Sequence, residues 1–280
     1  MALDIVVDTN QLQSARLRAF LEASTANRAV LTDYAAMEIH QGDAVKSICN
    51  AMRILTDFPT QVLVLRNTQF ICQLSGRAAG LQRRLIDRSL TSGFPDYIRK
   101  LDAAERGHHA LREEIKSKAA DARLQLNRML ADAADVAKIF DDLAVDFDKE
   151  ERRRIRDGEP FTSKMVDTLI RAVMDVAIVL FRSHPRSPRV PSFKELPNTF
   201  IFRNSLCCYL LALQWASTGG AKDVKDHKVR NDMVDSHFIT YATYFDGLLT
   251  SDAKALLLYK RAKEVLAATH SAAVKSGCIH

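Results

Sequence analysis

Four acidic residues stand where their carboxylates could meet at one site. Asp8 directly follows the apolar run 4–7, and Asp252 follows a second short apolar run near the end of the chain. An apolar run that gives way to small polar residues predicts a buried strand that ends there. Glu38 and Asp235 lie in stretches that we expect to be helical. Ligands of open parallel sheets bind beyond the carboxyl ends of the strands. We therefore expect the four carboxylates to face one crevice if the first and last strands are neighbours.

Carboxylates gathered in one pocket favour a particular chemistry. Like charges at close range cannot all remain ionised without cost, and a divalent cation relieves the repulsion. Oxygen ligands with retained waters suit Mg²⁺ or Mn²⁺. The reaction associated with such a centre is attack of a metal-activated water on a phosphodiester. The sequence therefore indicates a metal-dependent phosphodiester hydrolase.

The elements that would position these acids alternate between strands and helices. This alternation predicts an α/β fold with a central parallel sheet. Asp33 is expected to cap the second helix. We expect strands at 4–7, 28–32, 61–65 and 247–250, and helices at 11–23, from 33 through 39, at 204–217, at 232–244 and from 251 onward.

The middle of the chain has a different pattern. Between about 75 and 198 the sequence is long, charged and helical, and 96–154 is the longest stretch, with a turn expected near the acidic cluster 141–148. Three prolines within 183–192 predict an extended loop. We therefore expect residues 1–75 and 200–280 to form the α/β domain and residues 76–199 to form a helical insertion.

The charge balance is compatible with a polyanionic partner. The chain has 40 Lys and Arg against 34 Asp and Glu, which gives a net charge of +6. Two basic groups are candidates for contacts to a nucleic-acid backbone, although such runs can also be solvated helix faces. These candidates are Arg83, Arg84, Arg88, Arg152, Arg153 and Arg154.

Other classes of protein fit the sequence less well. The five cysteines include no CxxC pair, which argues against a zinc site. The first residues do not have the pattern of a secretory signal, and the longest apolar stretch, 205–216, is too short to span a bilayer. We therefore expect a cytoplasmic protein that does not interact with a membrane.

Segments at both ends of the chain resemble one family of nucleases. The stretch 6–10 (VVDTN) resembles the opening strand of PIN domains, and 32–38 (TDYAAME) resembles their second strand and the helix that carries the second acid. The stretch 235–252 resembles the part of the family that contains its third acid, a helix, a strand and a Thr-x-Asp ending. The resemblance covers roughly the first 75 and the last 80 residues, and it implies a three-layer PIN-like fold.

The resemblance also assigns roles to individual residues. It implies that Asp8, Glu38, Asp235 and Asp252 are catalytic metal ligands. Asp252 would bind the metal directly or through a water. Asp232, one helical turn before Asp235, is the alternative third acid. Asn10 and Thr250 would orient the carboxylates through hydrogen bonds. One or two Mg²⁺ or Mn²⁺ ions would be the cofactor.

The function implied is that of an endonuclease, with RNA expected before DNA as the substrate. A bacterial toxin or a phage-defence nuclease is a reasonable setting. The helical insertion would hold the substrate, a partner protein or a second copy of the chain. The alternative is an inactive PIN-like scaffold whose carboxylates cap helices and whose helical insertion binds a partner protein.

Two other enzyme families are weaker matches. The spacing of Arg230-Asn231 and His237 resembles the motif of HEPN ribonucleases, but that fold is all-helical and the strand–helix alternation argues against it. A HAD-type phosphatase needs an Asp two residues after its nucleophile, and that position is Asn10.

Overall fold

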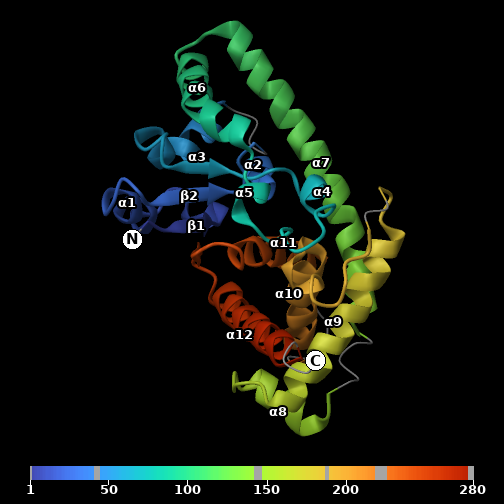
Figure 1. Cartoon of the computed structure of the whole chain (residues 1–280). Coiled ribbons are helices and arrows are strands. Elements are labelled where there is room, and N and C mark those ends of the chain that lie inside the picture. The colour runs from blue at the N-terminus through green and yellow to red at the C-terminus, as the bar shows by residue number, and fades with distance from the viewer. Residues whose placement is uncertain (1, 41–44, 142–146, 187–188, 218–225, 277–280) are drawn as a thin grey trace. The chain divides into compact units, whose positions relative to one another are not determined.

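The chain folds into two compact units, which we describe separately. The computed structural model describes residues 2–40, 45–141, 147–186, 189–217 and 226–276 (Figure 1). The first unit comprises residues 1–68, 82–130 and 244–253, and the second comprises 69–81, 131–243 and 254–280. These boundaries differ from the expected division into an α/β domain and an insertion at 76–199, and that division remains a prediction.

The first unit is built on a four-stranded sheet in which every strand pair is parallel. The strand order is β3-β2-β1-β4, so the first and last strands of the chain are neighbours. In the register, Val6 lies opposite Val30 on one side and opposite Leu248 on the other. The expected α/β class with a central parallel sheet is therefore confirmed. The strands are β1 (Asp4–Val7), β2 (Arg28–Leu31), β3 (Val62–Val64) and β4 (Gly247–Leu249).

Helices of the same unit pack against this sheet and form its core. Apolar residues of the strands and of five helices share one buried cluster, in which Val7, Leu17 and Leu55 are inaccessible to solvent. Burial of this apolar surface is the main stabilising contribution to the unit. The helices that contribute to this cluster are α1 (Ala15–Glu22), α2 (Asp33–Ile39), α3 (Val45–Asp57), α6 (Arg88–Glu105) and, through Ile115, α7 (His109–Asp141).

One expected helix start and one expected helix cap in this unit are wrong. The helix expected from residue 11 begins at Ala15, because a 3₁₀ turn (η1, Thr9–Gln11) comes first and the Ser14 hydroxyl caps α1. The cap of α2 is Thr32, whose hydroxyl accepts a hydrogen bond from the Ala35 amide at 3.0 Å. Asp33 is the first residue of that helix. Its carboxylate accepts hydrogen bonds from the backbone and side chain of Thr68.

The long helix expected over 96–154 is interrupted. Gly107, directly after α6, has a φ of 110°, a left-handed conformation that favours glycine. The next helix, α7 (His109–Asp141), starts in the first unit and continues into the second. The turn expected near the acidic cluster falls largely on residues 142–146, which lie outside the described residues. Short helices α4 (Thr68–Ile71) and α5 (Gln82–Leu85) complete the segment before α6.

The described residues of the second unit form helices and the loops between them, and none of them belongs to a strand. Its centre is α10 (Phe200–Ser217), which contacts α8, α9 and α11. Phe202, Leu206 and Leu211 of α10 are fully buried, as expected for an apolar helix enclosed by others. None of the helices, as far as the chain is described, is long and apolar enough to cross a membrane. The surrounding elements are α8 (Lys149–Arg156), α9 (Ser163–Ser183), η3 (Leu196–Asn198), α11 (Asp226–Ala242) and α12 (Ala253–Ser276).

Candidate functional site

Asp8 is the centre of a polar cluster at the carboxyl end of β1. Its side chain is 6% exposed. The Thr250 hydroxyl, which follows β4, donates to Asp8 Oδ2 at 2.6 Å, and the Asn10 side-chain amide donates to the same oxygen. The parallel pairing of β1 with β4 brings these residues together, because the Asp8 amide also donates to the Leu249 carbonyl at 3.0 Å. Neutral donors therefore hold the Asp8 carboxylate in place.

Glu38 lies beside Asp8 through a shared neighbour. The Thr9 hydroxyl donates to Glu38 Oε2 at 2.7 Å and lies 3.4 Å from Asp8 Oδ1. Burial raises the pKa of Glu38 above its ordinary value, the hydrogen bond from Thr9 opposes that shift, and the negative charge of Asp8 adds to it. Two carboxylates from a strand end and a helix thus meet at one hydroxyl group.

Asp252 is joined to this cluster through its backbone. The Asp252 amide donates to the Thr250 hydroxyl oxygen at 3.0 Å, and the amide of Ser251 donates to Asn10 Oδ1 at 3.3 Å. The Arg16 guanidinium lies 3.5 Å from the Thr250 carbonyl oxygen. The loop after β4 is therefore fixed to the loop after β1 by side chains from both.

The remaining predicted acids belong to the second unit. Asp235 and Asp232 both lie on α11 and are half-buried. Asp232 accepts a hydrogen bond from the Trp215 indole at 2.8 Å and forms an ion pair with Lys254. The carboxylate of Asp232 therefore already has a cationic partner, which makes it a poorer metal ligand than a carboxylate held by neutral donors.

The cluster in the first unit contains oxygen groups of the kind that Mg²⁺ prefers as ligands. Across the described residues, no group of three or more His, Cys, Asp or Glu side chains is arranged to hold a metal ion. Asp8 and Glu38 nonetheless provide two carboxylates, and Mg²⁺ is commonly bound through one or two carboxylates while it retains several waters. Their oxygen ligands suit such an ion, and a complete set of protein ligands is not required.

Thr9 is the functional candidate that sequence reasoning missed. Its hydroxyl connects the two carboxylates, whereas Asn10 and Thr250, which the sequence does single out, contact Asp8. The available signal is the position of Thr9 between two polar residues at the end of a strand, where a side chain faces the sheet edge.

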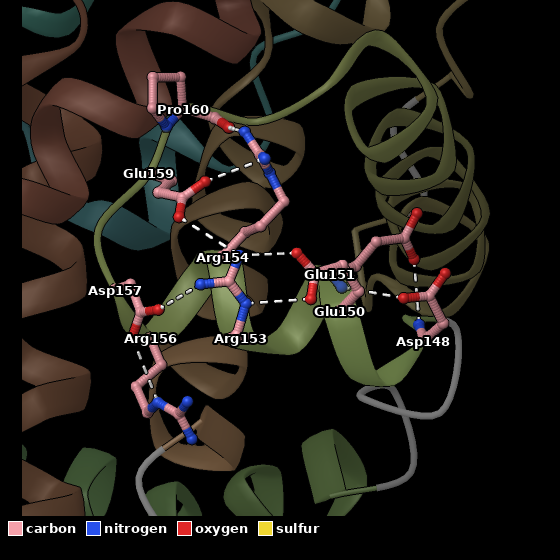
Figure 2. A network of polar contacts seen from close by, with 9 residues as sticks. All are labelled: Asp148, Glu150, Glu151, Arg153, Arg154, Arg156, Asp157, Glu159 and Pro160. Atoms are coloured by element: carbon pink, nitrogen blue, oxygen red, sulfur yellow. Dashed lines mark hydrogen bonds and ion pairs between the residues drawn. The ribbon is translucent and has the colours of Figure 1, made fainter.

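The two candidate basic groups lie in different units. In the first unit, Arg83 and Arg88 are exposed and Arg84 is half-buried. In the second unit, Figure 2 shows Arg153 between the carboxylates of Glu150 and Asp157.

Arg154 is likewise paired, with Glu159 at 2.9 Å. Arg152 is exposed, and its side chain has no ion pair with any residue that the structure describes. Arg153 and Arg154 therefore have internal partners, and Arg152 is the member of its group that remains available for an external anion.

The motif resembling HEPN ribonucleases falls in the helical second unit. His237 Nδ1 lies 2.8 Å from the Met233 carbonyl oxygen, and burial lowers the pKa of His237 to about 4. The side chain of Arg230 lies outside the described part of the chain. The imidazole of His237 is thus neutral at physiological pH, and one of its nitrogens is bound to its own helix.

Comparisons of the chain with protein-family models, with curated proteins and with solved structures find no match. The arrangement of the residues therefore carries the functional argument.

Proposed function

We propose that the first unit is a PIN-like, metal-dependent endonuclease that hydrolyses phosphodiester bonds, with RNA as the expected substrate. The observation that supports this most is the meeting of Asp8 and Glu38 at the Thr9 hydroxyl, at the carboxyl edge of a parallel sheet. This edge is where α/β folds bind their ligands.

The cation would be held by Asp8 and Glu38. Asp252 and Asp235 are the further ligands that the resemblance implies. When bound, Mg²⁺ or Mn²⁺ would lower the pKa of a water and stabilise the negative charge that develops on the phosphate. The protein's own part is orientation: Thr250 and Asn10 fix one oxygen of Asp8, and Thr9 fixes one oxygen of Glu38.

The electrostatics of the cluster support a cation. Asp8 is buried and its described hydrogen-bond donors are uncharged, so the bonds that orient it leave its negative charge uncompensated. Glu38 adds a second carboxylate whose ionisation is opposed by burial and by Asp8. A divalent cation would relieve both penalties.

The wider assignments follow from the same proposal. The net charge of +6 suits a nucleic-acid substrate. A cytoplasmic toxin or defence nuclease is the proposed setting. The helical insertion, residues 76–199, is the proposed binding region for a partner protein or for a second copy of the chain.

The test is cleavage of labelled single-stranded RNA and DNA with Mn²⁺ or Mg²⁺. We expect metal-dependent cutting by the wild type and a loss of about a hundredfold or more in Asp8→Asn and Asp235→Asn, because removal of a charged ligand weakens the centre. Asp96→Asn is the matched control, since Asp96 is an exposed acid on α6 paired with Arg99 and Lys100.

Each outcome separates the proposal from its alternative. Loss in Asp8→Asn with retention in Asp235→Asn would support the cluster and remove Asp235 from the ligand set. A wild type that cuts neither nucleic acid with either metal would favour the inactive scaffold, with the helical unit as the binding module. Circular dichroism of each variant distinguishes loss of chemistry from loss of fold.

A further inference from the structure

Helix α8 presents basic side chains on one face. The helix begins with Lys149, and Arg152, Arg153 and Arg156 follow it by three, four and seven residues. This spacing places the four side chains on a single side of a helix. The opposite side is buried, with Ile155 1% exposed and Glu151 9% exposed. The helix is therefore anchored by one face and presents cations from the other.

Internal ion pairs account for only part of this charge. Arg153 bonds to Glu150 and Asp157, and Glu151 pairs with Lys164 at 2.9 Å (Figure 2 shows the Arg153 pairs). The acids around α8 are thus largely neutralised by Arg153 and by residues outside the basic face.

Three cations remain with little or no compensation. The side chains of Lys149 and Arg152 are exposed and make no ion pair or hydrogen bond with another described residue. Arg156 has a contact with its sequence neighbour Asp157 at 3.4 Å, and its side chain is 56% exposed. Arg153 therefore stabilises the helix internally, whereas the other three residues have charge available for an external anion.

The same cations line a hollow in the second unit. It measures about 380 Å³, and it is lined by the basic face of α8, by Glu150, which pairs with Arg153, and by Ala216 near the end of α10. From Lys149 to Arg156 the helix rises about 10 Å, which exceeds the separation of successive phosphates along one strand of a nucleic acid. Arg side chains also bind phosphate oxygens through a pair of parallel N–H donors.

We infer that Lys149, Arg152 and Arg156 form a binding site for the phosphodiester backbone of a single-stranded nucleic acid, without reading its sequence. The inference deepens the proposed function, on which the choice of ligand rests. A membrane surface fits less well, because the apolar residue of this helix, Ile155, is buried and cannot enter a bilayer.

The experiment measures binding separately from cleavage. Full-length protein carrying Asp8→Asn, in EDTA, is titrated into fluorescein-labelled oligo(U), and anisotropy is followed across a series of salt concentrations. The test variant adds Lys149→Gln, Arg152→Gln and Arg156→Gln. The matched control instead adds Arg99→Gln, Lys100→Gln and Arg106→Gln, which removes the same charge from exposed positions on α6 and at its C-terminal cap.

We expect the α8 variant to bind about tenfold or more weakly and to lose about 2 from the slope of log affinity against log salt, since each phosphate contact to a single strand contributes about 0.7. Arg152→Gln alone should lose about 0.7. A charge-conserving variant that combines Lys149→Arg, Arg152→Lys and Arg156→Lys should keep most of the affinity, because a charge contact to the backbone survives these exchanges.

Three results would overturn the inference. The first is equal weakening in the α8 and α6 variants, which would show an effect of net charge alone. The second is no weakening in either variant. The third is binding of anionic phospholipid vesicles that depends on α8 while oligo(U) binding does not. A chain that binds oligo(U) through α8 but cuts nothing would instead contradict the proposed nuclease and leave this site intact.

Discussion

The two ends of β1 each place a buried aspartate, and the two are held in opposite ways. Asp4 and Asp8 are both 6% exposed. Asp4 receives two hydrogen bonds of 2.7 Å from the guanidinium of Arg28, so its charge is matched by a cation. Asp8 receives its bonds from the neutral side chains of Thr250 and Asn10. An ion pair both orients a carboxylate and neutralises its charge. Neutral donors orient the carboxylate but leave its negative charge, which can then attract a cation.

The largest effect that this contrast predicts is on metal-dependent stability. We expect Mn²⁺ at about 100 times its dissociation constant to stabilise the wild type by about 2.7 kcal/mol and to stabilise Asp8→Asn far less. Asp4→Asn should lose only about 1 kcal/mol of folding stability, because Arg28 is 42% exposed and solvent screens the ion pair. This variant should keep the full stabilisation by Mn²⁺. Urea unfolding with and without Mn²⁺ measures both. An equal response in Asp8→Asn and wild type would erase the contrast.

A smaller effect is expected from the neutral donor itself. Thr250→Val removes the hydroxyl that bonds to Asp8 and accepts from the Asp252 amide, and we expect metal affinity or cleavage to fall about 10- to 100-fold. Thr91→Val is the matched control, since the Thr91 hydroxyl accepts from the Val64 amide in the same unit but away from Asp8. Similar losses in both variants would mean that a general packing defect, and not orientation of Asp8, is being measured.

The smallest effect concerns pH. Because the pKa of Glu38 is raised in the fold by burial and by Asp8, the folded state binds this proton more tightly than the unfolded state does. Metal-free stability should therefore decrease as pH rises from about 4.3, the ordinary pKa of Glu, through the raised pKa of Glu38. Glu38→Gln should remove that slope, and saturating Mn²⁺ should reverse its sign, because the cation selects the ionised form. Urea midpoints across pH, with and without Mn²⁺, test this, and a slope unchanged in Glu38→Gln would assign it to another group.

The sheet could be predicted from the sequence because its signals are local. The run 4–7 matches β1, and the expected strands at 28–32 and 247–250 match β2 and β4 to within one residue. Each is a short apolar run closed by small polar residues. The sequence alone does not determine whether the first and last strands are neighbours, because strand order depends on contacts between distant segments.

Two features of the fold and the site depend on contacts between distant segments and could not be predicted from the sequence. Thr9 is one of many threonines until folding brings Glu38 to its hydroxyl. The partition into two units likewise reflects packing of distant segments. The pairing of Arg153 with Glu150 and Asp157, in contrast, was readable from separations of three and four residues on one helix.

The position of β4 in the chain also orders the events of synthesis. Asp8 and Thr250 are 242 residues apart in the sequence. At about 5 to 20 residues per second, the ribosome adds Thr250 roughly 12 to 50 s after Asp8. During that interval β1 lacks its outer neighbour and Asp8 lacks the hydroxyl that orients it. A ribosome-bound chain that has not reached Gly247 therefore has an incomplete cluster, and the proposed activity arises only after β4 has been made.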